Sequence, residues 1–275
     1  MRRRILLVLV LISFTAVSAK AVKQFLRPIS LDSAYINTEK KNEIRAGFDY
    51  LRDGNDNNYS VNSYSVNVKY KRAFDTEIPT RASVSLGLEL LNEEFDESFD
   101  FSELDFSNMV VGLEAAPLNK EDLSLVFYFD QTIPTGFGIG YLSPINTDTY
   151  AFHIGTRYQV KLLDRLRLFG DLSYIKSFSF DDDSEEGSLD YFSYINELVL
   201  DTGTKINPTL GFASNNLINA AFDSGDQFFI IPGVIIPFGE EDQSQARIGV
   251  PIGLAQPSGV FGYDIGVQAN FFTIF

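Results

Sequence analysis

Apolar and polar side chains alternate with a period of two along most of this chain, and that alternation constrains its fold most strongly. The clearest case is the C-terminal stretch, whose alternate positions hold Phe261, Tyr263, Ile265, Val267, Ala269, Phe271, Thr273 and Phe275. Successive side chains of a strand point to opposite faces, so this stretch predicts a strand with one apolar and one largely polar face. The pattern recurs in about twelve segments, and almost none shows helical periodicity.

The N-terminus has the layout of a secretory signal peptide. The basic residues of Met1–Arg4 precede the apolar run Ile5–Val17, and small residues follow. The run of about 13 residues is too short for a spanning helix, which needs roughly 20. We therefore expect export and cleavage after Ala19 or Ala21.

These boundaries divide the chain into a signal peptide over 1–19, a polar segment over 20–42 and one β domain over 43–275. The polar segment is either a periplasmic tail or a short plug directed inward, and the tail is the preferred interpretation.

Composition narrows the classes of function. The chain has 37 acidic and 22 basic residues and no cysteine. The acidic excess argues against a nucleic-acid partner, which would require basic stripes. Without cysteine there can be no disulfide, thiolate metal site or cysteine nucleophile, and we expect no cofactor.

Alternation alone fits either a soluble β-sandwich with apolar faces inward or a membrane barrel with apolar faces outward. Two observations favour the barrel. The apolar faces end repeatedly in Tyr or Phe, as expected for aromatic girdles at two lipid interfaces. The connections between the segments also mostly alternate between long and short. The expected long connections are Arg52–Ser60, Asn92–Glu103, Gln131–Thr147, Asp181–Leu189 and Ser214–Gly225. The sequence therefore predicts an all-β fold, a transmembrane antiparallel up-and-down β-barrel of about 12 strands.

A chain that ends on Phe275 behind a secretory signal resembles bacterial outer-membrane β-barrel proteins. That resemblance implies a location in the outer membrane of a Gram-negative envelope, among outer-membrane lipid and lipopolysaccharide. It also implies that Phe271 and Phe275 belong to the signal read by the barrel-assembly machinery.

Three short motifs carry a second resemblance. Ile248–Leu254, Tyr263–Gly266 and Ile133–Gly136 are similar to parts of the MetA-pathway phenol-degradation family of outer-membrane proteins. The resemblance covers the last stretch of the chain and one loop, and it implies passage of small apolar or aromatic compounds.

The inward faces carry charges of both signs. We take as pore-lining candidates Arg45, Asp49, Lys69, Arg81, Glu89, Glu114, His153, Arg157, Arg167, Asp171, Glu197, Arg247 and Asp264. The same alternation assigns to this face Glu43, Asp130, Lys161, Arg165 and Lys205. Such a lumen is either a hydrated pore or an interior filled with ion pairs. Twelve strands lie between filled eight-stranded barrels and open porins, which favours a narrow or gated channel.

Two connections have unusual composition. The segment Thr132–Leu142 is apolar and glycine-rich, so we consider it as a constriction at the barrel mouth, with Ile133, Phe137, Ile139 and Leu142 as candidates. Packing against neighbouring loops is the alternative. Acidic residues gather in two other loops, and Asp181, Asp182, Asp183 and Glu185 are candidates for binding divalent cations. Solvated loop charge is the preferred interpretation.

His153 is the single histidine, so a histidine-dependent hydrolytic site would have to use it. In the outer-membrane phospholipase family the catalytic Ser and His face lipid, whereas here Phe152 and Ile154 take that face. In the outer-membrane aspartyl protease family an Asp stands two residues before the His, and here that residue is Ala151. We expect a hydrogen-bonded lumen residue, no catalytic residues and no enzyme.

The predicted function is passive diffusion of small solutes, apolar ones included, through an outer-membrane channel. The alternative is a non-conducting structural or surface-interaction barrel whose acidic loops bind divalent cations or a partner.

Overall fold

A computed structural model describes most of the predicted β domain and the end of the segment before it. The described residues are 34–55, 59–95, 99–133, 138–139, 149–179, 190–217, 226–238, 244–255 and 265–275. The expected signal peptide lies outside them. No helix in the described part of the chain is long and apolar enough to cross a membrane.

The described residues form strands in nearly every segment where the alternation predicts one. Their bounds are β1 Asn42–Asn55, β2 Tyr59–Phe74, β3 Thr80–Phe95, β4 Phe99–Lys120, β5 Leu123–Ile133, β6 Gly138–Ile139, β7 Thr149–Leu163, β8 Leu166–Ser179, β9 Asp190–Leu200, β10 Asn207–Leu217, β11 Asp226–Phe238, β12 Ser244–Gly249, β13 Ile252–Ala255 and β14 Ile265–Ile274.

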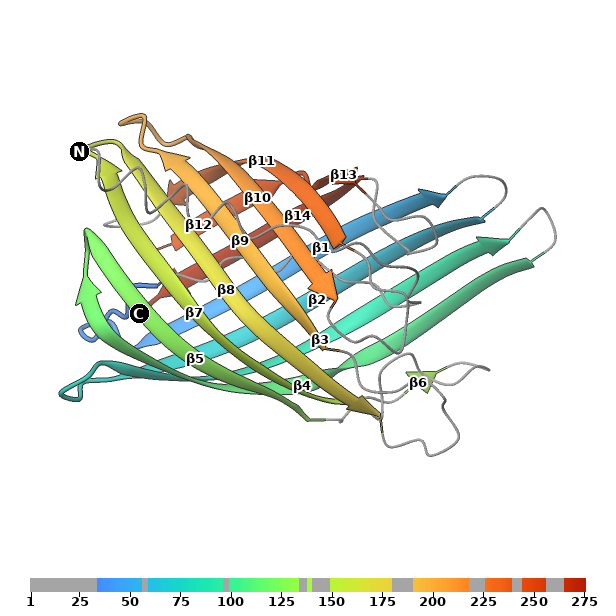
Figure 1. Cartoon of the computed structure of the whole chain (residues 1–275), viewed down its shortest axis with the longest axis horizontal. Coiled ribbons are helices and arrows are strands. Elements are labelled where there is room, and N and C mark those ends of the chain that lie inside the picture. The colour runs from blue at the N-terminus through green and yellow to red at the C-terminus, as the bar shows by residue number, and fades with distance from the viewer. Residues whose placement is uncertain are drawn as a thin grey trace.

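The strands form a single closed barrel (Figure 1). Each barrel strand pairs antiparallel with its neighbour in the sequence, and β14 pairs back onto β1. Strands β12 and β13 are two parts of one barrel strand, interrupted at Pro251, which has no N–H to donate to the ladder. The short β6 pairs only with β4 and adds no strand to the wall. The barrel therefore has twelve antiparallel strands, as predicted.

The two ends of the barrel differ. Short links at 75–79, 121–122, 164–165 and 201–206 lie at one end, which we call the turn end. The C-terminus lies at the same end (Figure 1). There Phe275 and Asn42 exchange two backbone hydrogen bonds of 2.9 and 3.0 Å, which close the barrel beyond the last strand residue.

The apolar faces point outward. On β4, Leu113 is 64% exposed and its neighbour Glu114 only 3%; on β5, Phe127 is 53% exposed and Tyr128 only 3%. Many other outward positions are exposed apolar residues, among them Phe271 and Phe275. An exposed apolar surface of this extent suits lipid, so the orientation is the one predicted for a membrane barrel.

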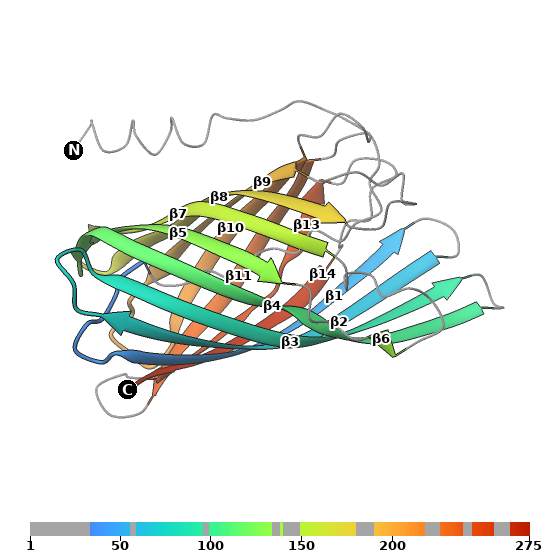
Figure 2. The same cartoon turned by 90° about the horizontal axis from the view of Figure 1, so that it is seen from below.

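Two connections that we predicted to be long are short, and these predictions were wrong. Strands β1 and β2 pair up to Asn55 and Tyr59, and β3 and β4 pair up to Phe95 and Phe99. The backbone ladder continues through these segments, which are rich in polar residues. Both hairpins therefore extend beyond the other strands, as Figure 2 shows. Backbone pairing there does not need an apolar face.

Strand β11 has apolar residues on both faces, so its inward face could not be predicted from the alternation. In the structure Phe229 and Ile231 are each 2% exposed and face inward, whereas Pro232 and Phe238 are exposed. The inward apolar residues belong to a cluster inside the lumen, which explains the lost alternation.

Candidate functional site

An ionic network in the lumen is centred on Glu114 of β4. Lys71 Nζ lies 3.4 Å from Glu114 Oε1, Arg157 Nη1 lies 3.0 Å from the same oxygen, and Arg81 Nε donates to Glu114 Oε2 at 2.9 Å. The three cations come from β2, β3 and β7. Arg81 also binds Glu43 of β1 at 3.1 Å. Because all these side chains are buried, the network satisfies charges that would otherwise be costly inside a barrel.

A second part of the same network surrounds Arg157. Its Nε lies 2.9 Å from Asp171 Oδ2, and its guanidinium lies 3.8 Å from the centre of the Tyr128 ring. Tyr128 donates a hydrogen bond of 2.7 Å to Asp171, and His153 Nε2 lies 2.9 Å from the Tyr128 hydroxyl. His153 is therefore the hydrogen-bonded lumen residue that the sequence predicts.

Glycines provide the space for this network. Gly155 lies opposite Tyr128 in the register, and a Cβ there would lie 2.5 Å from the Tyr128 side chain. Gly112 lies opposite Asp130, and a Cβ there would meet its carboxylate. These two inward glycines let large side chains lie flat across the wall.

An apolar cluster occupies another part of the lumen. Leu51 of β1 packs with Ile195, Ala213, Phe229 and Ile231, which lie on β9, β10 and β11. Strand β1 is paired with β2 and β14, so the cluster joins parts of the wall that are not neighbours. All five residues are at most 4% exposed, so their side chains fill this part of the lumen.

The described end of the N-terminal segment enters the barrel at the turn end. Ala34 and Ile36 are buried against Ala73, Ala116 and Val126. Asn119 accepts a hydrogen bond of 2.9 Å from Ile36 N and donates one of 2.8 Å to Ile36 O. Of the two interpretations of this segment, the inward plug describes residues 34–36 better than the tail that we preferred.

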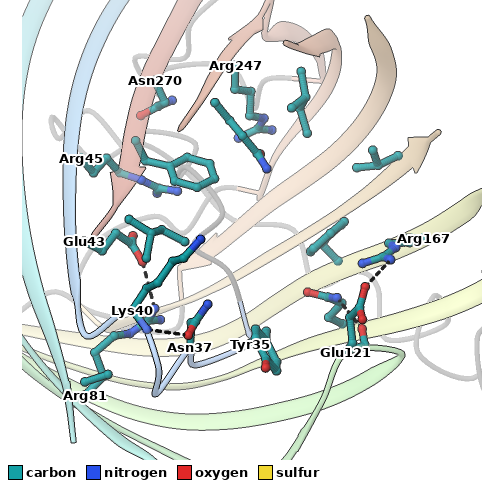
Figure 3. Close-up of a pocket in the computed structure, with 18 of the residues that line it drawn as sticks. Tyr35, Asn37, Lys40, Glu43, Arg45, Arg81, Glu121, Arg167, Arg247 and Asn270 are labelled. Carbon is teal, nitrogen blue, oxygen red and sulfur yellow. Dashed lines mark hydrogen bonds and ion pairs between the residues drawn. The ribbon is translucent and has the colours of Figure 1, made fainter. Parts of the chain in front are cut away.

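A cavity of about 260 Å³ lies at the turn end of the lumen, beside this segment (Figure 3). Among the described residues, its walls include the cations Lys40, Lys41, Arg45, Arg81, Arg167 and Arg247 and the carboxylates Glu43, Glu121 and Glu197. Arg247 Nη2 lies 2.8 Å from Glu197, and Arg167 Nη2 lies 3.2 Å from Glu121.

Most of the predicted lumen residues occupy the interior. Six are at most 8% exposed: Arg45, Arg81, Glu114, Arg157, Asp171 and Glu197. Lys69 lies 3.9 Å from Asp130, and Ser65 donates to Asp49 at 3.5 Å. Glu89 lies in β3, and Asp264 lies outside the described residues. Arg165 and Lys205 were wrongly assigned to the inward face, because both are exposed in turns, where alternation no longer applies.

The predicted loop sites are only partly described. Ile133 is the last residue of β5, and Ile139 in β6 pairs with Leu104 of β4. Phe137, Leu142 and the metal candidates Asp181, Asp182, Asp183 and Glu185 lie outside the described residues. Within the described ranges, no group of three or more carboxylates and histidines is arranged to hold a metal ion.

Among the interior residues that the sequence analysis missed are Lys71, Tyr128 and Ile36. Lys71, which is fully buried, shares the inward parity of Lys69, and Tyr128 shares that of Asp130, so alternation would have found both. Ile36 had no comparable signal, because its burial depends on a side-chain contact with Asn119 from a distant part of the chain.

No protein-family model and no curated protein sequence matches this chain. Solved structures do match. An outer-membrane channel from Pseudomonas putida F1 aligns with a TM-score of 0.64 at 11% identity, over 86% of this chain and 95% of that one. The β domain of the Bordetella autotransporter BrkA aligns with a TM-score of 0.59 at 10% identity, over 86% of this chain and 100% of that one.

The transport unit of the autotransporter AIDA-I from Escherichia coli aligns with a TM-score of 0.54 at 8% identity, over 86% of this chain and 90% of that one. At such identities the likenesses concern the fold. The chain therefore has the barrel fold of bacterial outer-membrane proteins, as predicted. Its lumen contains an ionic network, an apolar cluster and a basic cavity.

Proposed function

We propose that this barrel is an outer-membrane channel for passive diffusion of small solutes, apolar ones included. The observation that carries the proposal is that the barrel has a charged interior and that a cavity lies in its lumen. A barrel that only anchored surface loops would not need the buried cations Arg45 and Arg81 beside an internal cavity, since buried charge is costly.

The structural neighbour from Pseudomonas putida F1 is described as a channel, which is consistent with this role. The resemblance of Ile248–Leu254 to the MetA-pathway family supports apolar or aromatic compounds as solutes.

The barrier to diffusion would lie at two levels of the lumen. The network around Glu114 and the cluster around Leu51 both fill space between parts of the wall that are not neighbours. Side chains at these two levels would narrow the path of a solute, so the channel would be narrow and gated. The segment Thr132–Leu142, which begins at the end of β5, is a further candidate gate.

Single-channel recording in a planar bilayer tests the proposal. We expect small, steady current steps from the purified barrel, and uptake of solutes graded by size and polarity into liposomes that contain it. A protein that inserts and shows neither current steps nor uptake would instead be a structural or surface-interaction barrel.

The gating role of Thr132–Leu142 has its own test. Shortening this segment should raise the conductance if it narrows the mouth. An unchanged conductance in a correctly folded variant would remove the segment from the gate and leave the two lumen levels.

A further inference from the structure

We infer that the cavity at the turn end binds small neutral carbonyl compounds, in which one C=O group is attached to a compact apolar body. The inference rests on the proposed function, because it names a class of solute for the same lumen. It is carried by the pairing of the charges in the cavity wall, by a buried donor without a partner, and by the apolar side chains of the wall.

The charged side chains of the cavity wall are already engaged. Among the described residues, each of the three carboxylates in the wall lies within 3.2 Å of an arginine of the same wall: Glu43 of Arg81, Glu121 of Arg167 and Glu197 of Arg247. Lys40 and Arg45 have contacts of their own, and Lys41 is exposed to solvent. An ion that entered the cavity would lose its water without gaining an unengaged counter-charge. Because that loss is costly, the wall favours a neutral solute.

A hydrogen-bond donor in the wall has no partner. Asn270 of β14 lines the cavity (Figure 3) and is 6% exposed, and its Nδ2 makes no hydrogen bond. An unsatisfied buried donor costs free energy, so an acceptor oxygen on a bound solute would stabilise this side chain. No described residue of the wall has a buried side-chain acceptor that lacks a partner, so the solute needs an acceptor and no donor. A carbonyl oxygen has this property.

Gly47 of β1 makes room for the amide of Asn270. It lies opposite Asn270 of β14 and opposite Asn67 of β2 in the register. A Cβ at Gly47 would lie 3.0 Å from Asn270 Oδ1 and 2.7 Å from Asn67 Oδ1, so both amides lie over the glycine. The two asparagines therefore share one level of the lumen, but only Asn270 belongs to the cavity wall.

Apolar side chains form much of the remaining wall. They are Phe169, Val199, Ile235, Phe272 and Ile274. The volume of about 260 Å³ is below the range of drug-sized sites, which begins at roughly 300 Å³, so it suits a compact solute. A solute with an apolar ring would bury that ring against these side chains, which favours binding through the hydrophobic effect.

Ligand-observed NMR titration of the detergent-solubilised barrel at neutral pH tests the inference, with protein-free micelles as the blank. Cyclohexanone is the probe; cyclohexanecarboxylate and cyclohexylammonium keep the ring and carry an anion or a cation in place of the ketone. We expect cyclohexanone to bind saturably and each ion to bind about tenfold more weakly or less, because neither ion finds an unengaged counter-charge. No saturable binding of cyclohexanone, or equal binding of either ion, would overturn the inference.

Variants locate the binding. Asn270→Leu keeps the approximate size of the side chain and removes the donor, so it should weaken cyclohexanone binding about fivefold. Asn270→Ala removes the same donor with a smaller side chain and should weaken binding as well. Asn67→Leu is the matched control, because it makes the same change at the same level of the lumen but outside the cavity wall, and it should bind as the wild type does.

Folding of each variant is checked by the change of gel migration on boiling. Unchanged affinity in a folded Asn270 variant, or an equal loss in Asn67→Leu, would sink the site. If neither Asn270 variant folds, the three affinities of the wild type still decide the question. Current steps without cyclohexanone binding would refute the carbonyl site alone, whereas cyclohexanone binding without current steps or solute uptake would refute the channel alone.

Discussion

Arg157 of β7 lies 3.0 Å from Glu114 of β4, although β5 separates their strands in the wall. The contact therefore crosses the lumen side of β5, instead of following the ladder between neighbouring strands. Glu114 receives two further cations at this point, Lys71 and Arg81, so one buried carboxylate connects three strands to its own.

Replacement of Glu114 by Gln should destabilise the barrel strongly. The substitution keeps the shape of the side chain but leaves three buried cations beside a neutral amide, and breaking a buried ion pair costs about 3–5 kcal/mol. Urea unfolding in lipid vesicles measures the change. Glu121→Gln is the control, because Glu121 is 77% exposed and pairs with Arg167 near solvent, where a pair contributes about 0–1 kcal/mol. Equal losses in the two variants would contradict the central place of Glu114.

Shortening Leu51 to Ala should open the apolar level of the lumen. Leu51 is 1% exposed, so the change leaves space inside the cluster and lowers the free energy of unfolding by about 2–5 kcal/mol. If this level limits diffusion, single-channel conductance rises. Leu113→Ala makes the same chemical change on the outward face and should leave conductance as it was. A rise in both variants, or in neither, would argue against a barrier at Leu51.

Loss of the Asn119 side chain should release the N-terminal segment. The chain has no cysteine, so Tyr35→Cys introduces a single thiol next to Ile36. In an added Asn119→Ala background both hydrogen bonds to Ile36 are lost, each worth about 1 kcal/mol, so labelling by a water-soluble maleimide should become about tenfold faster or more. Asn207→Ala, which removes a turn amide that binds Thr202, is the matched control. Equal labelling rates in all backgrounds would show that Asn119 does not hold the segment.

The barrel could be predicted from the sequence because the environment acts on every strand in the same way. Lipid outside and charge inside impose a period of two, as at Phe127 and Tyr128, and this period gives strand number, orientation and most inward residues. The period fails where both faces meet the same surroundings. Phe229 and Ile231 belong to an apolar cluster inside the barrel, and Phe228 and Ile230 lie on the other face. The inward face of β11 could therefore not be predicted from the alternation.

The site was harder to predict, since it depends on contacts between distant strands. Alternation places Arg45 and Asn270 on inward faces, but only the register of β1 with β14 brings them to one side of the cavity. The burial of Ile36 depends on Asn119, which no local pattern connects to it.

The assignment of apolar faces to lipid and charged faces to the lumen is tested most directly by fluorescence quenching with brominated lipids. The chain has no tryptophan, so Phe127→Trp and Tyr128→Trp each introduce a single fluorophore, at adjacent positions of β5 and at nearly the same depth. Brominated acyl chains should quench the emission of Phe127→Trp strongly and leave that of Tyr128→Trp largely unchanged. Equal quenching of the two, or stronger quenching at position 128, would contradict the orientation on which the channel and its lumen sites depend.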